Sequence, residues 1–207
     1  MTQYHTDIIQ KRFREVNMIT TERLILRPFT ENDAADLLEY LHEPTVHCFF
    51  DMKISSMDEA KEEAVKRKET DCYFAIELKD TGKVIGEIFV HPDGEGMEED
   101  CSEGGYSDDT YSPCWMLNTD YHGKGYAYEA VKAVFDFLFN VKGARRLYAY
   151  TEDYNIASQK LCEKLNMRRE GLFMEFISFV NDENGEPIYE NTYQYAILKK
   201  EWENRDK

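Results

Sequence analysis

The stretch from residue 114 to residue 151 constrains the fold more than any other part of the chain. It reads as an apolar strand, a turn with glycines at positions 123 and 125, a long amphipathic helix to about Asn140, and a second strand over residues 145–151. A strand–helix–strand unit of this length implies two parallel strands joined by a right-handed crossover. The chain is therefore expected to contain a mixed sheet.

The helix of this unit carries a clear apolar face. Its apolar residues recur with the i, i+3, i+4, i+7 spacing of a helix that packs on a sheet. A glycine at position 143 follows the last turn and is expected to end the helix. The predicted buried face consists of Ala127, Ala130, Val131, Val134, Phe135 and Leu138.

The other segments alternate between strand and helix patterns. Leu24 and Leu26 lie on one face of residues 22–29, which predicts a strand. Thr30, with Asp33 three residues later, is typical of a helix start, and residues 79–82 are typical of a hairpin turn. The remaining predicted elements are helices over residues 30–41, 58–69 and 155–165, and strands over residues 72–79, 83–90, 169–180 and 189–198.

The helix over residues 155–165 has signals at both ends. Asn155 is expected to cap its start, and Asn166 stands where a left-handed residue would end it. Ala157, Leu161 and Leu165 are expected to form its buried side. The fold class predicted from all these segments is α/β, with a mixed sheet that is mostly antiparallel and has one central parallel pair.

The chain has 207 residues and is expected to form a single domain over residues 18–207, preceded by an arm or short helix over residues 1–17. Residues 93–109 hold eight acidic residues and no basic one, which predicts a solvated loop inserted into this domain. The loop over residues 43–55 is rich in aromatic residues. These are either core residues or one wall of an acceptor pocket.

Composition excludes several classes of protein. A formal net charge of −16 argues against a nucleic-acid partner. No segment approaches the roughly 18 apolar residues of a membrane span, and residues 1–17 lack the apolar core of a signal peptide. The five scattered cysteines form no Cys-x-x-Cys pair, so reduced thiols, a cytoplasmic location and no metal site are expected.

The turn with glycines 123 and 125 precedes a helix start and could hold a phosphate, because unpaired backbone N–H groups converge there. An ordinary strand-to-helix turn explains the same residues. The P-loop pattern fails because one residue separates the two glycines, and the dinucleotide fingerprint fails because Tyr128 stands at its third glycine.

The sequence His122-Gly-Lys-Gly-Tyr-Ala resembles the acyl-CoA pyrophosphate loop of the GNAT acetyltransferase superfamily. Residues 115–131, 143–149 and 155–171 resemble that family's fourth strand and third helix, fifth strand, and fourth helix with the strand after it. Thr21-Glu-Arg-Leu-Ile-Leu-Arg-Pro and Tyr193-x-Tyr-Ala-Ile-Leu resemble the branch of ribosomal-protein N-acetyltransferases, the RimJ/RimL type.

The resemblance implies the GNAT fold, in which the central parallel strands splay apart, helices cover both faces of the sheet, and acetyl-CoA is the cosubstrate. Backbone of Met116, Leu117 and Asn118 would pair with the pantetheine arm. Asn155, with Ser158 nearby, would reach it from the helix start, although helix capping alone explains both residues. The implied pyrophosphate site consists of His122, Gly123, Lys124, Gly125, Tyr126 and Ala127.

The family reaction, direct attack of an amine on a thioester through a tetrahedral intermediate, needs a base, a donor to the oxyanion and an acid. The donor is expected to be a backbone N–H near Met116 or Leu117. Glu175 is the first candidate for the base, Glu87 the second and Glu103 the third. Each carboxylate could instead be a solvated residue on the polar face of its strand.

The chain departs from the family pattern at three places. Cys162 stands where many relatives carry the tyrosine acid, and it is either that acid or a small buried residue. Ser112 and Pro113 occupy the positions of a frequent catalytic carboxylate. His122 replaces the usual Gln or Arg of the loop but can still donate to a phosphate.

The leading hypothesis is an N-acetyltransferase that acts on a protein α-amine or a small amine, as a monomer or homodimer. The first alternative is a non-catalytic acyl-CoA-binding or sensor module that has lost its acid and base. The second is an acidic interaction domain that uses the loop over residues 93–109.

Overall fold

The computed structural model describes residues 18–70, 72–92 and 109–205. They fall into two compact units. Among the described residues, the first consists of those up to Thr45, those of Phe49–Phe89 and Trp115–Ala133, and the second of Val46–Cys48, those of Val90–Cys114 and those from Val134 onward. The predicted N-terminal helix and the acidic loop up to residue 108, including Glu103, lie outside the described residues.

Antiparallel strands form the sheet of the first unit. Strands β1 (Ile19–Thr20), β2 (Leu24–Arg27), β3 (Tyr73–Leu78) and β4 (Val84–Pro92) pair in chain order. Leu24 and Leu26 are fully buried on β2, which confirms the predicted alternation. The hairpin between β3 and β4 is also confirmed, with Gly82 at φ 72° and its N–H donating to the carbonyl of Leu78.

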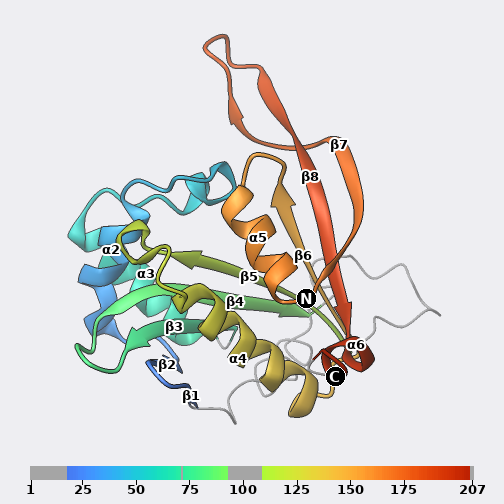
Figure 1. The fold of residues 1–207 in the computed structure, drawn as a ribbon. Helices are drawn as coiled ribbons and strands as arrows, with labels where there is room; N and C mark the ends of the chain where they lie inside the picture. Colours follow the sequence, from blue (N-terminus) through green and yellow to red (C-terminus); the bar gives the residue numbers. More distant parts are fainter. Residues whose placement is uncertain (1–17, 71, 93–108, 206–207) are drawn as a thin grey trace, which may run out of the picture. The chain divides into compact units, whose positions relative to one another are not determined.

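Two helices of the first unit, α2 (Ala34–Leu41) and α3 (Met57–Glu69), pack against each other (Figure 1). The predicted helix start at Thr30 needs a correction, because a 3-10 turn, η1 (Glu31–Asp33), comes first. The Asp33 carboxylate accepts hydrogen bonds from Thr30 N at 2.7 Å and from Thr30 Oγ1 at 3.1 Å. These bonds stabilise the tight turn ahead of the α-helix. A second 3-10 segment is η2 (His47–Met52).

Strand β5 (Thr110–Leu117) and helix α4 (Tyr126–Asn140) are each divided between the two units. A short 3-10 turn, η3 (Thr119–Tyr121), lies between them. The helical spacing of apolar residues in α4 is confirmed at most positions. Ala130, Val131, Val134, Phe135 and Leu138 are all fully buried, whereas Ala127 in the first turn is half-buried.

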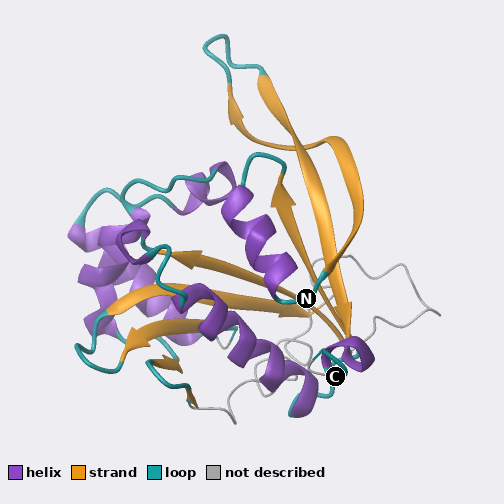
Figure 2. Cartoon of the chain, viewed as in Figure 1, coloured by secondary structure: helices purple, strands orange, loops and turns teal. Residues whose placement is uncertain are grey.

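The second unit contains β6 (Arg146–Glu152), α5 (Ile156–Lys164), β7 (Arg168–Asn181), β8 (Pro187–Leu198) and α6 (Lys199–Trp202). Its strand order is β5-β6-β8-β7. The β5–β6 pair is parallel and the other pairs are antiparallel. In Figure 2, β7 and β8 continue as a hairpin past the end of β6.

Both ends of α5 follow the sequence signals. The Asn155 side chain accepts a hydrogen bond from Ser158 N at 3.2 Å, and Asn166 has the left-handed φ of 59° that ends the helix. The predicted buried side of α5 is partly wrong. Leu165 is buried and Leu161 half-buried, but Ala157 is exposed and Cys162 is the fully buried residue of the helix. The buried face is therefore rotated from the predicted one.

The strands together confirm the predicted fold class. The sheet is mixed and mostly antiparallel, with β5–β6 as its parallel pair. Within the described part of the chain, no helix is long and apolar enough to cross a membrane. The structure describes Cys48, Cys72, Cys114 and Cys162, and no disulfide joins any two of these four.

Candidate functional site: the glycine loop and its surroundings

The loop between β5 and α4 has the geometry of an anion cradle. Gly123 and Gly125 have φ values of 73° and 83°, which side chains other than glycine rarely adopt. At the start of α4, Glu129 N donates to the carbonyl of Gly125. The N–H groups of Tyr126 and Ala127 therefore precede the intrahelical ladder, at the positive end of the helix dipole.

Arg23 and Glu129 hold this loop in place. The Glu129 carboxylate accepts hydrogen bonds from Arg23 Nε at 2.7 Å, Arg23 N at 2.8 Å and Thr21 Oγ1 at 2.6 Å. Arg23 also donates to the carbonyl of Lys124 at 3.0 Å and lies over the Tyr126 ring. No local sequence pattern signals this support, because the partners lie more than 100 residues apart in the chain.

The two basic side chains of the loop bond to its own backbone. His122 Nε2 lies 2.9 Å from the carbonyl of Leu117. Because a carbonyl oxygen only accepts, Nε2 donates this bond. Lys124 Nζ donates to the carbonyl of Asp120 at 2.8 Å. Both side chains are exposed, so either can turn toward a bound anion by exchanging one hydrogen bond.

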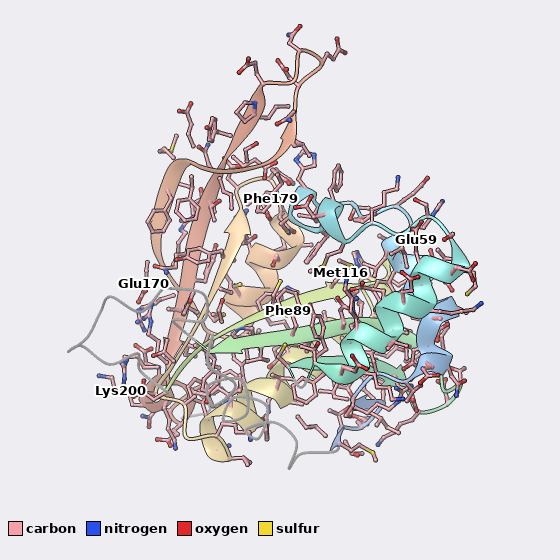
Figure 3. The ribbon with its side chains drawn as sticks, turned by 180° about the vertical axis from the view of Figure 1, so that it is seen from behind. Glu59, Phe89, Met116, Glu170, Phe179 and Lys200 are labelled. Atoms are coloured by element: carbon pink, nitrogen blue, oxygen red, sulfur yellow. The ribbon has the colours of Figure 1, made fainter. Side chains whose placement is uncertain are left out.

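Met116 and Leu117 lie against a bulge in β4. The β3–β4 register shifts between Ala75 and Glu77, and Gly86 lies in the shifted part of β4. A Cβ at Gly86 would stand 2.3 Å from the carbonyl oxygen of Met116. Figure 3 labels Met116 on β5 and Phe89 farther along β4. Glycine is thus required for the close approach of the two strands beside the predicted pantetheine position.

Asn118 ends β5 in a fixed conformation. Its side chain is buried, donates to Glu39 Oε1 at 3.0 Å and accepts from Asp120 N at 3.0 Å. Its backbone N–H donates to the carbonyl of Ile85 at 2.8 Å. These bonds connect the strand end to the glycine loop.

Replacing Gly86 by alanine is expected to disturb this part of β5. The new Cβ would clash with backbone atoms of Met116 and Leu117, which cannot move as a side chain can. We expect a loss of stability of about 1–3 kcal/mol, typical of overpacking, and at least 10-fold weaker acetyl-CoA binding. Chemical denaturation and calorimetry measure the two effects.

A matched control is Gly171→Ala, since a Cβ there has no atom within 4 Å. Equal acetyl-CoA affinity in Gly86→Ala and the control would contradict the importance of this strand contact.

Asn155, Ser158 and Cys162 all lie on or just before α5, in the second unit. The Cys162 side chain is fully buried, and burial raises the pKa of its thiol to about 12. The ordinary pKa of a thiol is about 8.5, so the Cys162 thiol stays protonated and is a weaker acid than an ordinary thiol. Transfer of that proton to a thiolate of ordinary basicity would be uphill, which favours the packing role for Cys162.

Glu175 lies in an irregular part of β7. Its φ is 48°, and its backbone N–H donates to Asn191 Oδ1 at 3.0 Å. The β7–β8 register shifts between Phe173 and Ile177. The Glu175 side chain is exposed, as a solvated carboxylate would be.

Glu87 has a different environment, since it is fully buried on β4. Its two carboxylate oxygens accept hydrogen bonds from Arg67 Nε at 2.7 Å and Nη2 at 3.0 Å, and Tyr40 OH donates at 3.0 Å. Three donors already engage this carboxylate, so its geometry is that of a core ion pair.

The first unit thus brings together the loop residues 122–127, residues 116–118 and Glu87, while Asn155, Ser158, Cys162 and Glu175 belong to the second unit. Among the described residues, no group of three or more His, Cys, Asp or Glu side chains is arranged to hold a metal ion.

Comparison with known proteins gives the family. Residues 23–168, more than half of the chain, match the acetyltransferase (GNAT) domain. The chain belongs to the GNAT acetyltransferase family. The match covers β2, the glycine loop and α5, so the resemblance first seen in the loop extends through both units.

Individual relatives agree with the family. The chain is 30% identical over 185 residues to a Bacillus subtilis (strain 168) protein named "Uncharacterized N-acetyltransferase YnaD", covering 89% of this chain and 98% of the relative. A GNAT-family acetyltransferase structure from Bacillus anthracis is 26% identical, covers 88% of this chain and 99% of that one, and has a TM-score of 0.73.

A ribosomal-protein-S5-alanine acetyltransferase from Vibrio fischeri shares the fold. It is 20% identical, covers 89% of this chain and 98% of that one, and has a TM-score of 0.63. The family match and these relatives establish that this GNAT chain is an acyltransferase.

Proposed function

We propose that this GNAT enzyme transfers the acetyl group of acetyl-CoA to a primary amine. The acceptor would be a protein N-terminal α-amine or a small-molecule amine. The motifs at residues 21–28 and 193–198 resemble the RimJ/RimL type, and the fold shared with the Vibrio fischeri enzyme is compatible with that branch.

The observation that carries the proposal is the loop after β5. Two glycines with left-handed φ values lead into α4, where N–H groups precede the first intrahelical bond. Such a site suits a pyrophosphate, because backbone donors and the helix dipole act on the same anion. His122, Gly123, Lys124, Gly125, Tyr126 and Ala127 would hold it, and Met116, Leu117, Asn118, Asn155 and Ser158 would line the pantetheine arm.

The chemistry would proceed by direct attack of a neutral amine on the thioester carbonyl. A backbone N–H of Met116 or Leu117 would donate to the oxyanion of the tetrahedral intermediate. Glu175 remains the first candidate for the base, because it is exposed, whereas Glu87 is engaged by Arg67 and Tyr40. The high pKa of Cys162 argues against this thiol as the acid, and the proton that the attacking nitrogen releases would balance the charge of the leaving thiolate.

Calorimetry with acetyl-CoA and a thiol-release assay with a panel of amines test the proposal. We expect acetyl-CoA to bind with a stoichiometry of one, and thiol to be released only when an amine is present. Absence of acetyl-CoA binding by the wild-type protein would refute the proposal.

Binding of acetyl-CoA without thiol release from any amine would instead support the alternative of a CoA-binding sensor module. This alternative is supported by the burial of both Glu87 and Cys162, two of the candidate catalytic residues.

A further inference from the structure

A group of polar side chains in the second unit, some buried and some reaching solvent, has no part in the function proposed above. We call it the Glu152–Glu190 cluster, and all its members belong to one compact unit. Two of them are carboxylates that are each more than nine-tenths buried. The cluster consists of His47, Cys48, Glu152, Tyr154, Glu190 and Thr192.

Glu190 is held by two neighbours. Its carboxylate contacts His47 Nδ1, and Tyr154 OH donates to Glu190 Oε2 at 3.3 Å. The Tyr154 hydroxyl in turn accepts from His47 N at 3.3 Å, and the two rings lie 5.5 Å apart. These contacts fix the position of the Glu190 carboxylate.

The hydrogen-bond partners of Glu152 among the described residues are neutral. The Cys48 thiol donates to its carboxylate, and Asn155 Nδ2 lies 3.5 Å from Glu152 Oε2. Burial, and then the charge of Glu152, raise the pKa of the Cys48 thiol. Burial also raises the pKa of the Tyr154 hydroxyl, and the charges of Glu152 and Glu190 add to the effect.

By formal charge, the described members of this cluster are more negative than positive. Across the described part of the chain, neither Glu152 nor Glu190 forms a salt bridge with a lysine or arginine. Even with His47 protonated, two carboxylates would leave one negative charge. Buried charges are normally paired, since burial of an unpaired one is costly. The cluster is therefore expected to receive a cation.

Thr192 supplies an independent sign of a ligand. Its hydroxyl oxygen is buried and, among the described residues, has no hydrogen-bond partner. Thr192 pairs directly with Glu152 across the β6–β8 register, so both side chains lie on one face of the sheet, about 5 Å apart at Cβ. Glu190 precedes Thr192 by two residues on β8 and shares that face. An unsatisfied buried hydroxyl thus lies on the same face of the sheet as the two carboxylates.

These observations lead us to propose that the Glu152–Glu190 cluster binds an alkylammonium group of the acceptor. A primary ammonium has three N–H donors, and Glu152, Glu190 and Thr192 supply three acceptors. The inference rests on the proposed function, since it names the part of the enzyme that selects a cationic amine.

The exposure of the cluster and the charge of the chain are both consistent with an organic ammonium ligand. The side chain of His47 is 37% exposed and Tyr154 is also exposed, so the cluster reaches solvent at these two residues. No described group of three potential ligands has the arrangement of a metal site. The net charge of −16 attracts organic cations from solution.

The test is calorimetric titration of 1,4-diaminobutane into protein saturated with CoA. The wild type is expected to bind the diamine at least 10-fold more tightly than 1,4-butanediol, its neutral analogue. Glu152→Gln and Glu190→Gln keep the shape and one acceptor oxygen but remove the charge, and each is expected to weaken diamine binding at least 10-fold. Thr192→Val, which is isosteric, is expected to weaken it 3- to 10-fold.

Glu186→Gln, an exposed carboxylate in the turn before β8, is the matched control and should bind like the wild type. Circular dichroism and acetyl-CoA affinity confirm folding of each variant, and Thr192→Val remains informative if a carboxylate variant does not fold. Diamine binding that is no tighter than diol binding, or that is unchanged in the folded variants, would overturn the inference. Acetyl-CoA binding by the wild type is measured separately, so failure of the proposed function is distinguishable.

Discussion

Replacing Gly123 by aspartate is expected to weaken acetyl-CoA binding at least 100-fold, about 2.7 kcal/mol. A carboxylate at this position would stand among the N–H groups that are proposed to hold the pyrophosphate. A unit charge about 4 Å from a phosphate charge costs about 4 kcal/mol at an effective dielectric constant near 20. Calorimetry measures the loss, and higher salt should reduce it.

Two variants separate charge from backbone strain. Gly123→Asn has the same shape as Gly123→Asp, and both new side chains tolerate a left-handed φ, so the asparagine variant is expected to lose less than 10-fold. Gly82→Asp adds the same charge at φ 72°, in a hairpin where a Cβ meets no atom within 4 Å, and should bind normally. Equal affinity of Gly123→Asp and Gly123→Asn would show that no phosphate lies at this loop.

Features set by a few neighbouring residues could be predicted from the sequence. The Asn155 cap, the left-handed Asn166 and the turn at Gly82 each depend on the chemistry of one turn of chain. The alternation of Leu24 and Leu26 required only one buried face of β2. The glycine loop is also a local feature, because the residues of its sequence motif are the residues that form its turn.

Features made by residues far apart could not be predicted. Glu190 meets His47 across 143 positions of the chain, and Arg23 supports the glycine loop through Glu129 across 106. Neither pair has a local pattern. For the same reason the sequence ranked Glu175 ahead of Glu87 without any information on the environment of either carboxylate, which depends on the side chains that the fold places beside it.

Glu87 illustrates the consequence for the catalytic prediction. In the sequence it is a carboxylate in a strand, equivalent to Glu175. In the structure it is fully buried and paired with Arg67, which is 2% exposed and also contacts Glu63. Burial by itself would lower the pKa of Arg67, but Glu87, together with the smaller effects of Tyr40 and Glu63, outweighs burial and raises that pKa. We therefore expect substitutions at this pair to act mainly on the stability of the fold rather than on catalysis.

Replacing Arg67 by methionine is expected to lower the free energy of unfolding by about 3–5 kcal/mol, because it leaves the Glu87 carboxylate buried without its ionic partner. Adding Glu87→Leu should restore part of the loss, since two apolar side chains need no ionic partner, although the buried Tyr40 hydroxyl then loses its acceptor. Urea denaturation of the two single variants and the double variant gives the coupling energy.

The pH dependence of the free energy of unfolding of the Arg67→Met variant identifies the cause of its lower stability. Desolvation favours the neutral carboxyl, so the deficit relative to wild type should shrink as the pH falls and the orphaned carboxylate takes up a proton, and grow as the pH rises. A cavity left by a shorter side chain would cost the same at every pH. A deficit independent of pH, or additive effects in the double variant, would show that the Arg67–Glu87 ion pair does not stabilise the first unit and would return Glu87 to the candidate bases.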